Sequence, residues 1–138
     1  MIGAYERHAK DLGILESVEF LGELSDDALA QAYSSSSVFV LPSLNRLEGF
    51  GIVALEALSY GTPVITTSVA GSCDFIMRRN AGRVVPPGDE VALTTALAAM
   101  LEDPAEASAM GLRGAEAVGC EFGWDGIAGR IVDLYRRQ

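Results

Sequence analysis

Two glutamates, Glu48 and Glu56, stand eight residues apart in the segment EGFGIVALE, and only small or apolar residues separate them. The residues that follow Gly49 are apolar on every side of a helical wheel, which predicts a buried helix over residues 50–60. A carboxylate inside a buried helix is costly unless it finds hydrogen-bond donors. Those donors belong to the backbone of a neighbouring loop, to solvent at a sheet edge, or to a ligand such as a ribose.

The start of this helix is suited to bind an anion. Two glycines frame Phe50, so the backbone can come close to a ligand. The first N–H groups of a helix have no intrahelical partner and lie at the positive end of the helix dipole. Here these groups belong to Phe50, Gly51, Ile52 and Val53.

The spacing of the two glutamates fits one class of ligand. Along a helical rise, Glu48 and Glu56 lie at most ~12 Å apart, with the anion site between them. Two polyhydroxyl groups joined by a diphosphate have about this separation. We therefore expect a nucleotide diphosphate sugar as the ligand, held by Glu48, the turn Gly49–Val53 and Glu56.

The remaining sequence predicts the elements that position these groups. Short β-branched and apolar runs alternate with helical patterns, which indicates an α/β fold: a Rossmann-like parallel sheet with helices on both faces. The predicted strands are residues 18–21, 38–41, 64–67 and 83–85, with the middle two buried on both faces. The predicted helices are residues 5–12, 26–34, 50–60, 73–79, 90–102, 105–118 and 125–136.

Local signals set the ends of two helices and the extent of the domain. Ser25 precedes two aspartates and is a good N-cap. Gly61-Thr62-Pro63 ends the glutamate-bearing helix. We predict one domain over residues 1–138. The chain opens on a helix, whereas a doubly wound domain normally begins on a strand, so we expect this domain to be truncated at its N-terminus.

Composition narrows the class of protein. The 138 residues are 49% hydrophobic and 21% charged, with a net charge of −9, which argues against a nucleic-acid partner. Cys73, Cys120 and a single histidine give no metal-binding pattern and favour a reduced, cytoplasmic protein. No apolar run reaches the roughly 20 residues of a membrane span. The sequence is also compatible with peripheral contact with a membrane surface.

Several motifs in order resemble one family of enzymes: VEFLGELSDDALAQAYSSSSVFVLPS, EGFGIVALEALSYGTPVITT, AGRVVPPGD and FGWDGIAGRIVDLY. The segment from Glu48 to Glu56 resembles the E-x(7)-E motif of retaining GT-B glycosyltransferases, family 4 (glycosyl transferases group 1). The resemblance implies the C-terminal, donor-binding domain of such an enzyme, half of a GT-B fold. It implies that Glu48, as the catalytic-site residue, bonds hydroxyls of the donor sugar, that Glu56 bonds the nucleoside ribose, and that the amides of Gly49–Val53 face the sugar and the diphosphate. Sugar transfer with retention, without a metal or cofactor, follows from the same resemblance.

The chain also departs from the family. The usual GG-x-P-E is AGSCD here, with Cys73 and Asp74 at the last two positions. The resemblance places the family's first strands, its Gly-rich loop, the Arg and Lys that clamp the diphosphate, and the N-terminal acceptor-binding domain before residue 1. We therefore expect the isolated chain to be inactive.

Two other functions stay open. GFGIVA fits the G-x-G-x-x-A fingerprint of dinucleotide-binding domains. That reading needs an acid about 20 residues on, where the chain has TTSV over residues 66–69, and it leaves both glutamates unexplained. The other alternative is a nucleotide-binding module without catalytic activity.

Overall fold

The computed structural model describes residues 2–136, apart from the side chains of Ile2, Glu48 and Asp125. The chain divides into two compact units, Met1–Gln31 and Ala32–Gln138. Helix α2 (Asp26–Ser35) begins in the first unit and ends in the second.

The first unit contains helix α1 (Ile2–Asp11), the 3-10 turn η1 (Leu15–Ser17) and the beginning of α2. Ser25 caps α2 as predicted, because its Oγ accepts a hydrogen bond from the N–H of Ala28 at 3.4 Å. The acidic side chains of Asp26 and Asp27 lie in the first turn of α2, where they favour the positive end of the helix dipole.

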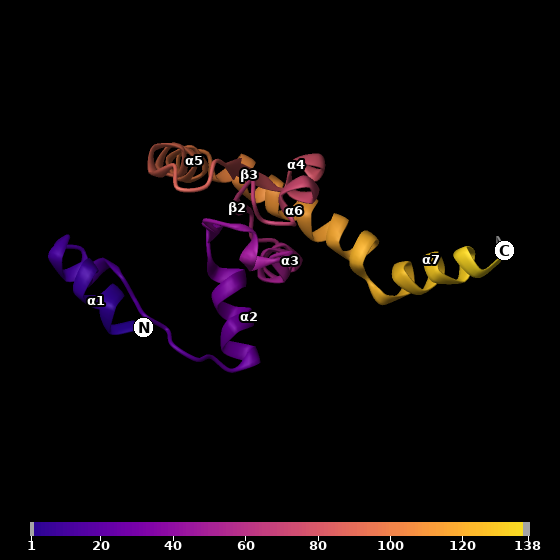
Figure 1. Ribbon diagram of the computed structural model, residues 1–138, viewed down its shortest axis with the longest axis horizontal. Helices are drawn as coiled ribbons and strands as arrows, with labels where there is room; N and C mark the ends of the chain where they lie inside the picture. The colour runs from indigo at the N-terminus through magenta and orange to yellow at the C-terminus, as the bar shows by residue number, and fades with distance from the viewer. Residues whose placement is uncertain (1, 137–138) are drawn as a thin grey trace. The chain divides into compact units, whose positions relative to one another are not determined.

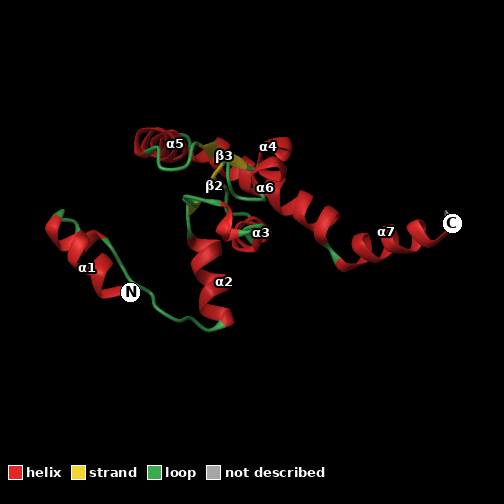
Figure 2. Cartoon of the chain, viewed as in Figure 1, coloured by secondary structure: helices red, strands yellow, loops and turns green. Residues whose placement is uncertain are grey.

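The predicted strand at residues 18–21 is wrong. These residues form a loop, drawn green before α2 in Figure 2. A strand exists only where a neighbour accepts its backbone hydrogen bonds, and no strand of the described chain pairs with this segment. The β-branched and aromatic side chains of this segment were therefore not sufficient to predict a strand.

The second unit is built on a parallel sheet of β1 (Phe39–Leu41), β2 (Val64–Thr67) and β3 (Gly82–Val85), in that order. Phe39 pairs with Val64, and Val64 pairs with Gly82. The central strand β2 is buried along its whole length, as predicted. Strand β1 is only half-buried, contrary to the prediction, because it pairs with β2 alone among the described residues.

Helices cover both faces of this sheet, which confirms the predicted architecture. On one face, side chains of α3 (Ile52–Ser59), α4 (Cys73–Arg79) and the second half of α6 (Pro104–Phe122) pack on Val64. On the other face, α5 (Glu90–Glu102) and the first half of α6 pack on Ile65. Figure 1 shows α3 and α5 on opposite sides of β2. Because successive residues of a strand point to opposite faces, β2 contributes to both cores.

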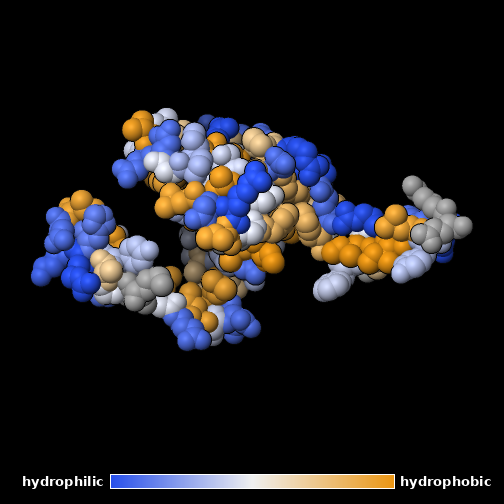
Figure 3. All heavy atoms as spheres, viewed as in Figure 1, coloured by the Kyte–Doolittle hydropathy of each residue, from blue (hydrophilic) through white to orange (hydrophobic). Residues whose placement is uncertain are grey.

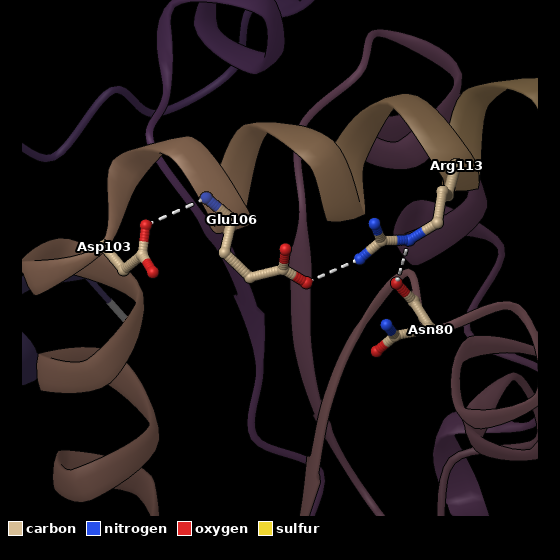
Figure 4. Close-up of polar contacts among 4 residues, drawn as sticks. All are labelled: Asn80, Asp103, Glu106 and Arg113. Carbon is tan, nitrogen blue, oxygen red and sulfur yellow. Dashed lines mark hydrogen bonds and ion pairs between the residues drawn. The ribbon is translucent and has the colours of Figure 1, made fainter.

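Polar contacts fix the first half of α6 (Figure 4). Asp103 caps the helix by accepting from the N–H of Glu106 at 3.0 Å. Arg113 bonds the Glu106 carboxylate at 2.7 Å and the backbone carbonyl of Asn80 at 3.1 Å. The arginine thus ties α6 to the turn between α4 and β3.

The last helix, α7 (Trp124–Arg136), keeps apolar side chains on the surface. Ile131, Val132 and Leu134 are exposed, and Figure 3 shows a hydrophobic band along this helix. The apolar side of α7 thus adds little to the two cores. Within residues 2–136, no helix is both long enough and apolar enough to cross a membrane.

Candidate functional site

A turn of unusual backbone geometry precedes α3, the helix that carries Glu56. A 3-10 turn, η2 (Arg46–Glu48), is capped by Asn45, whose side chain accepts from the N–H of Leu47 at 3.0 Å. Gly49 and Gly51 then take φ values of 66° and 74°, which other residues rarely adopt. This Gly49–Gly51 turn interrupts the helical path.

The helix consequently begins at Ile52, two residues later than predicted. Glu48 lies in the separate 3-10 turn and not on the axis of α3. The separation of ~12 Å along one helical rise therefore does not apply to the two glutamates. The side chain of Glu48 lies outside the described part of the molecule, so its place in the site stays a prediction.

Unpaired N–H groups gather where α3 begins, as the sequence predicted. Within the described residues, the backbone N–H groups of residues 50–53 have no hydrogen-bond acceptor. The N-cap residue, Gly51, has no side chain to satisfy them. An anion at this end of α3 would meet both free donors and the positive end of the helix dipole.

The loop after β2 packs against the Gly49–Gly51 turn and holds it in place. The N–H of Gly71 donates to the carbonyl of Gly49 at 3.0 Å. A methyl group on Gly51 would come within 2.9 Å of Leu41 Cδ2 and 3.3 Å of Ser72 Oγ, so Gly51 lies tightly against both. The fully buried Ser72 hydroxyl has no partner among the described atoms. The position of the turn thus depends on the AGSCD segment, where this chain departs from the GG-x-P-E pattern.

Glu56 is exposed, and the prediction that it lies in the dry interior is wrong. One side of α3, with Ala54, Ala57 and Leu58, packs into the core. The opposite stripe carries Ile52, Val53, Glu56, Ser59 and Tyr60, which are exposed. The apolar composition of the helix did not reveal which side the protein covers. The exposed position leaves the carboxylate accessible to a ligand.

Among the residues that the structure describes, one side chain donates a hydrogen bond to the Glu56 carboxylate. The hydroxyl of Tyr33, at the end of α2, donates to Glu56 Oε2 at 3.3 Å. Burial of the tyrosine, followed by the negative charge of Glu56, raises the pKa of the Tyr33 hydroxyl above its ordinary value. The phenol therefore stays protonated and donates at neutral pH.

Glu56 also borders a groove of about 680 Å³ between α3 and the junction of α6 and α7. The groove is mostly apolar and is lined by Phe50, Ile52, Leu55, Glu56, Ser59, Val118, Phe122, Trp124 and Ile127. Phe50 packs edge-on against Phe122, with ring centroids 6.0 Å apart.

The structure thus brings Phe50, Ile52 and Glu56 to one groove, while Gly49, Gly51 and Val53 do not line it. Sequence reasoning missed Tyr33, which lies 23 residues before Glu56, because no local spacing signals that contact. It also missed the hydrogen bond from Gly71 to Gly49, for which the run of small residues Ala70-Gly71-Ser72 is the one local signal. Among the described residues, no three His, Cys, Asp or Glu side chains are grouped to hold a metal ion.

Comparison with known sequences identifies the family. The profile described as "Glycosyl transferases group 1" matches residues 3–117. The chain belongs to the glycosyl transferases group 1 family. This finding confirms the family that the motifs around Glu48 and Glu56 resemble, and the residues of the turn and of α3 lie within the matched region.

Individual group 1 relatives agree with the assignment. The chain is 36% identical over 130 residues to a D-inositol 3-phosphate glycosyltransferase of Streptomyces avermitilis, covering 94% of this chain and 27% of that protein. It is 33% identical over 133 residues to a GDP-mannose-dependent alpha-(1-6)-phosphatidylinositol monomannoside mannosyltransferase of Mycobacterium tuberculosis, covering 93% and 34%. The chain thus spans about a third or less of the length of these relatives.

A solved structure of similar fold is the sucrose-phosphate synthase of Thermosynechococcus elongatus. It matches with a TM-score of 0.84 and 38% identity, over 96% of this chain and 33% of that protein. The parallel sheet with helices on both faces is therefore the architecture of a glycosyltransferase domain.

Proposed function

We propose that this chain is the donor-binding domain of a glycosyltransferase that moves a sugar from a nucleotide diphosphate sugar to an acceptor. The proposal includes retention of anomeric configuration, no requirement for a metal, a separate acceptor-binding domain and a cytoplasmic location. The proposed activity is that of a whole protein as long as the relatives. The isolated chain is expected not to catalyse sugar transfer.

The observation that carries the proposal is the unpaired set of N–H groups at the start of α3, one helical turn from an exposed carboxylate on the same helix. The N–H groups suit the diphosphate, and the Glu56 carboxylate suits ribose hydroxyls, since a carboxylate accepts several hydrogen bonds. In the reaction, fixed amide dipoles would stabilise the charge that develops on the leaving diphosphate. Group 1 membership supports the same chemistry.

The role proposed for Glu48 is tested by removing its carboxylate. Glu48→Ala should weaken binding of GDP-mannose by roughly tenfold and leave binding of GDP nearly unchanged, because only the former carries the sugar hydroxyls. GDP-mannose is the first ligand to test, because one relative is named GDP-mannose-dependent, and UDP-sugars are tested next. The affinities are measured by NMR titration. Equal losses for GDP and GDP-mannose would refute a contact with the sugar.

A second prediction concerns the support beneath the turn. A Cβ on Gly71 would lie 2.9 Å from Phe50 Cα and 3.1 Å from the carbonyl oxygen of Gly49. Gly71→Ala should therefore push the Gly49–Gly51 turn outward and weaken GDP binding severalfold. Gly129→Ala is the control, because a Cβ there meets no atom within 4 Å. If Gly71→Ala binds GDP as the unaltered chain does, the turn does not hold the diphosphate in the observed conformation.

A further inference from the structure

Tyr33 is held in place from three sides. Its backbone carbonyl accepts a buried hydrogen bond from the Thr62 hydroxyl at 2.6 Å. Its ring packs edge-on against Phe39, with centroids 5.6 Å apart, and is stacked on Tyr60 at 5.8 Å. The side chain is almost completely buried. Such a ring has little freedom, so its hydroxyl is a fixed point in the structure.

The Glu56 carboxylate, in contrast, is exposed and has no other hydrogen-bond partner among the described residues. A glutamate on a helix surface samples several rotamers, and holding one of them for a ligand costs conformational entropy. The Tyr33 hydroxyl donates to Oε2, and the second carboxylate oxygen has no hydrogen-bond donor among the described residues, so its lone pairs can accept from a ligand.

We propose that Tyr33 is a positioning residue that orients the Glu56 carboxylate for a ribose hydroxyl of the bound nucleotide. The inference rests on the proposed function, in which Glu56 contacts the ribose. Tyr33 itself touches the carboxylate and not the nucleotide. At 3.3 Å the hydrogen bond is longer than the usual O–H···O distance, so its effect on affinity is modest.

Tyr33→Phe removes the hydroxyl and keeps the ring in its packing between Phe39 and Tyr60. We expect the affinity for GDP to fall roughly three- to tenfold, measured by NMR titration of the full 138-residue chain. A nucleotide without ribose hydroxyls, 2′,3′-dideoxy-GDP, should bind equally to both proteins. Tyr60→Phe is the matched control, because the Tyr60 hydroxyl makes no hydrogen bond within the described residues, and its GDP affinity should be unchanged.

A double-mutant cycle separates positioning from a purely structural role. If Tyr33 acts through the carboxylate, Tyr33→Phe should cause no further loss in a Glu56→Gln background. An additive loss, or an equal loss with 2′,3′-dideoxy-GDP, would mean that Tyr33 serves only the packing and would overturn the inference.

The same cycle distinguishes the inference from the function on which it rests. A weakened Glu56→Gln together with an unaffected Tyr33→Phe overturns the positioning role alone. An unaffected Glu56→Gln overturns the ribose contact and the positioning role with it. Urea denaturation of each variant establishes that the compared proteins are folded.

Discussion

Glu56→Gln is expected to weaken binding of GDP about tenfold or more, with little change in the free energy of unfolding. A hydrogen bond to a charged group contributes about 1.5–3 kcal/mol, and the exposure of Glu56 places the effect near the lower limit. The small effect on folding follows because the carboxylate lies outside the core and has one long hydrogen bond, to Tyr33.

The direction of the change in GDP affinity distinguishes a direct contact of Glu56 with the nucleotide from the general electrostatic effect of removing one negative charge. The chain has a net charge of −9, so removal of one negative charge by itself favours an anionic nucleotide slightly. Glu102→Gln makes the same change on the exposed surface of α5 and should leave GDP binding unchanged or slightly tighter. If both variants bind GDP equally well, Glu56 makes no contact with the nucleotide.

Gly111→Ala is expected to destabilise the fold by about 2 kcal/mol or more, because over-packing a core costs typically 1–3 kcal/mol. A Cβ at this position would overlap the carbonyl oxygen of Gly61 and lie 3.1 Å from Pro63 Cδ. The obstacle is backbone in a left-handed turn, with φ of 80° at Gly61, so it cannot move aside as a flexible side chain would. A total stability of roughly 5–15 kcal/mol makes such a loss large.

A second glycine of the same helix gives the opposite expectation. Alanine is favoured over glycine inside a helix by about 1 kcal/mol, and this gain competes with the overlap at Gly111. At Gly119 a Cβ meets nothing within 4 Å, so Gly119→Ala should stabilise the protein by about 0.5–1 kcal/mol. Urea denaturation of both variants measures the contrast. Two changes of the same sign would contradict the close packing of α6 on the turn at Gly61.

The helices and strands that could be predicted are those whose own residues show a clear local pattern. VITT at residues 64–67 is a short run of β-branched residues next to a turn signal, and it forms the central strand β2. The helices that cover both faces of the sheet were predicted because their apolar periodicity, caps and flanking glycines agree with one another. Helix α4, for instance, has the predicted bounds Cys73–Arg79.

Features that depend on contacts with a distant segment of the chain could not be predicted from the local sequence. Residues 18–21 have strand propensity, but no strand of the described chain pairs with them. Helix α3 is apolar on every side, and only the packing of its neighbours leaves Glu56 exposed. The contact between Tyr33 and Glu56 spans 23 residues, and its geometry depends on how α2 and α3 pack.

Local backbone geometry limited the site prediction in another way. The unpaired N–H groups were expected from the helix start, and the structure has them at residues 50–53. The later start of α3 follows from the left-handed conformation of Gly51, which a glycine permits but does not dictate. The relation between Glu48 and Glu56 therefore could not be derived from a helical rise.

The most direct test of the account is an NMR titration of the chain with GDP that follows each backbone amide. The account predicts the largest chemical-shift changes at residues 50–53, where free N–H groups would meet the diphosphate, with smaller changes around Glu56. The arginines Arg78, Arg79 and Arg113, which line a separate cavity, offer the obvious competing anion site. Shifts confined to those arginines, with the amides of residues 50–53 unmoved at saturation, would contradict the proposed donor site.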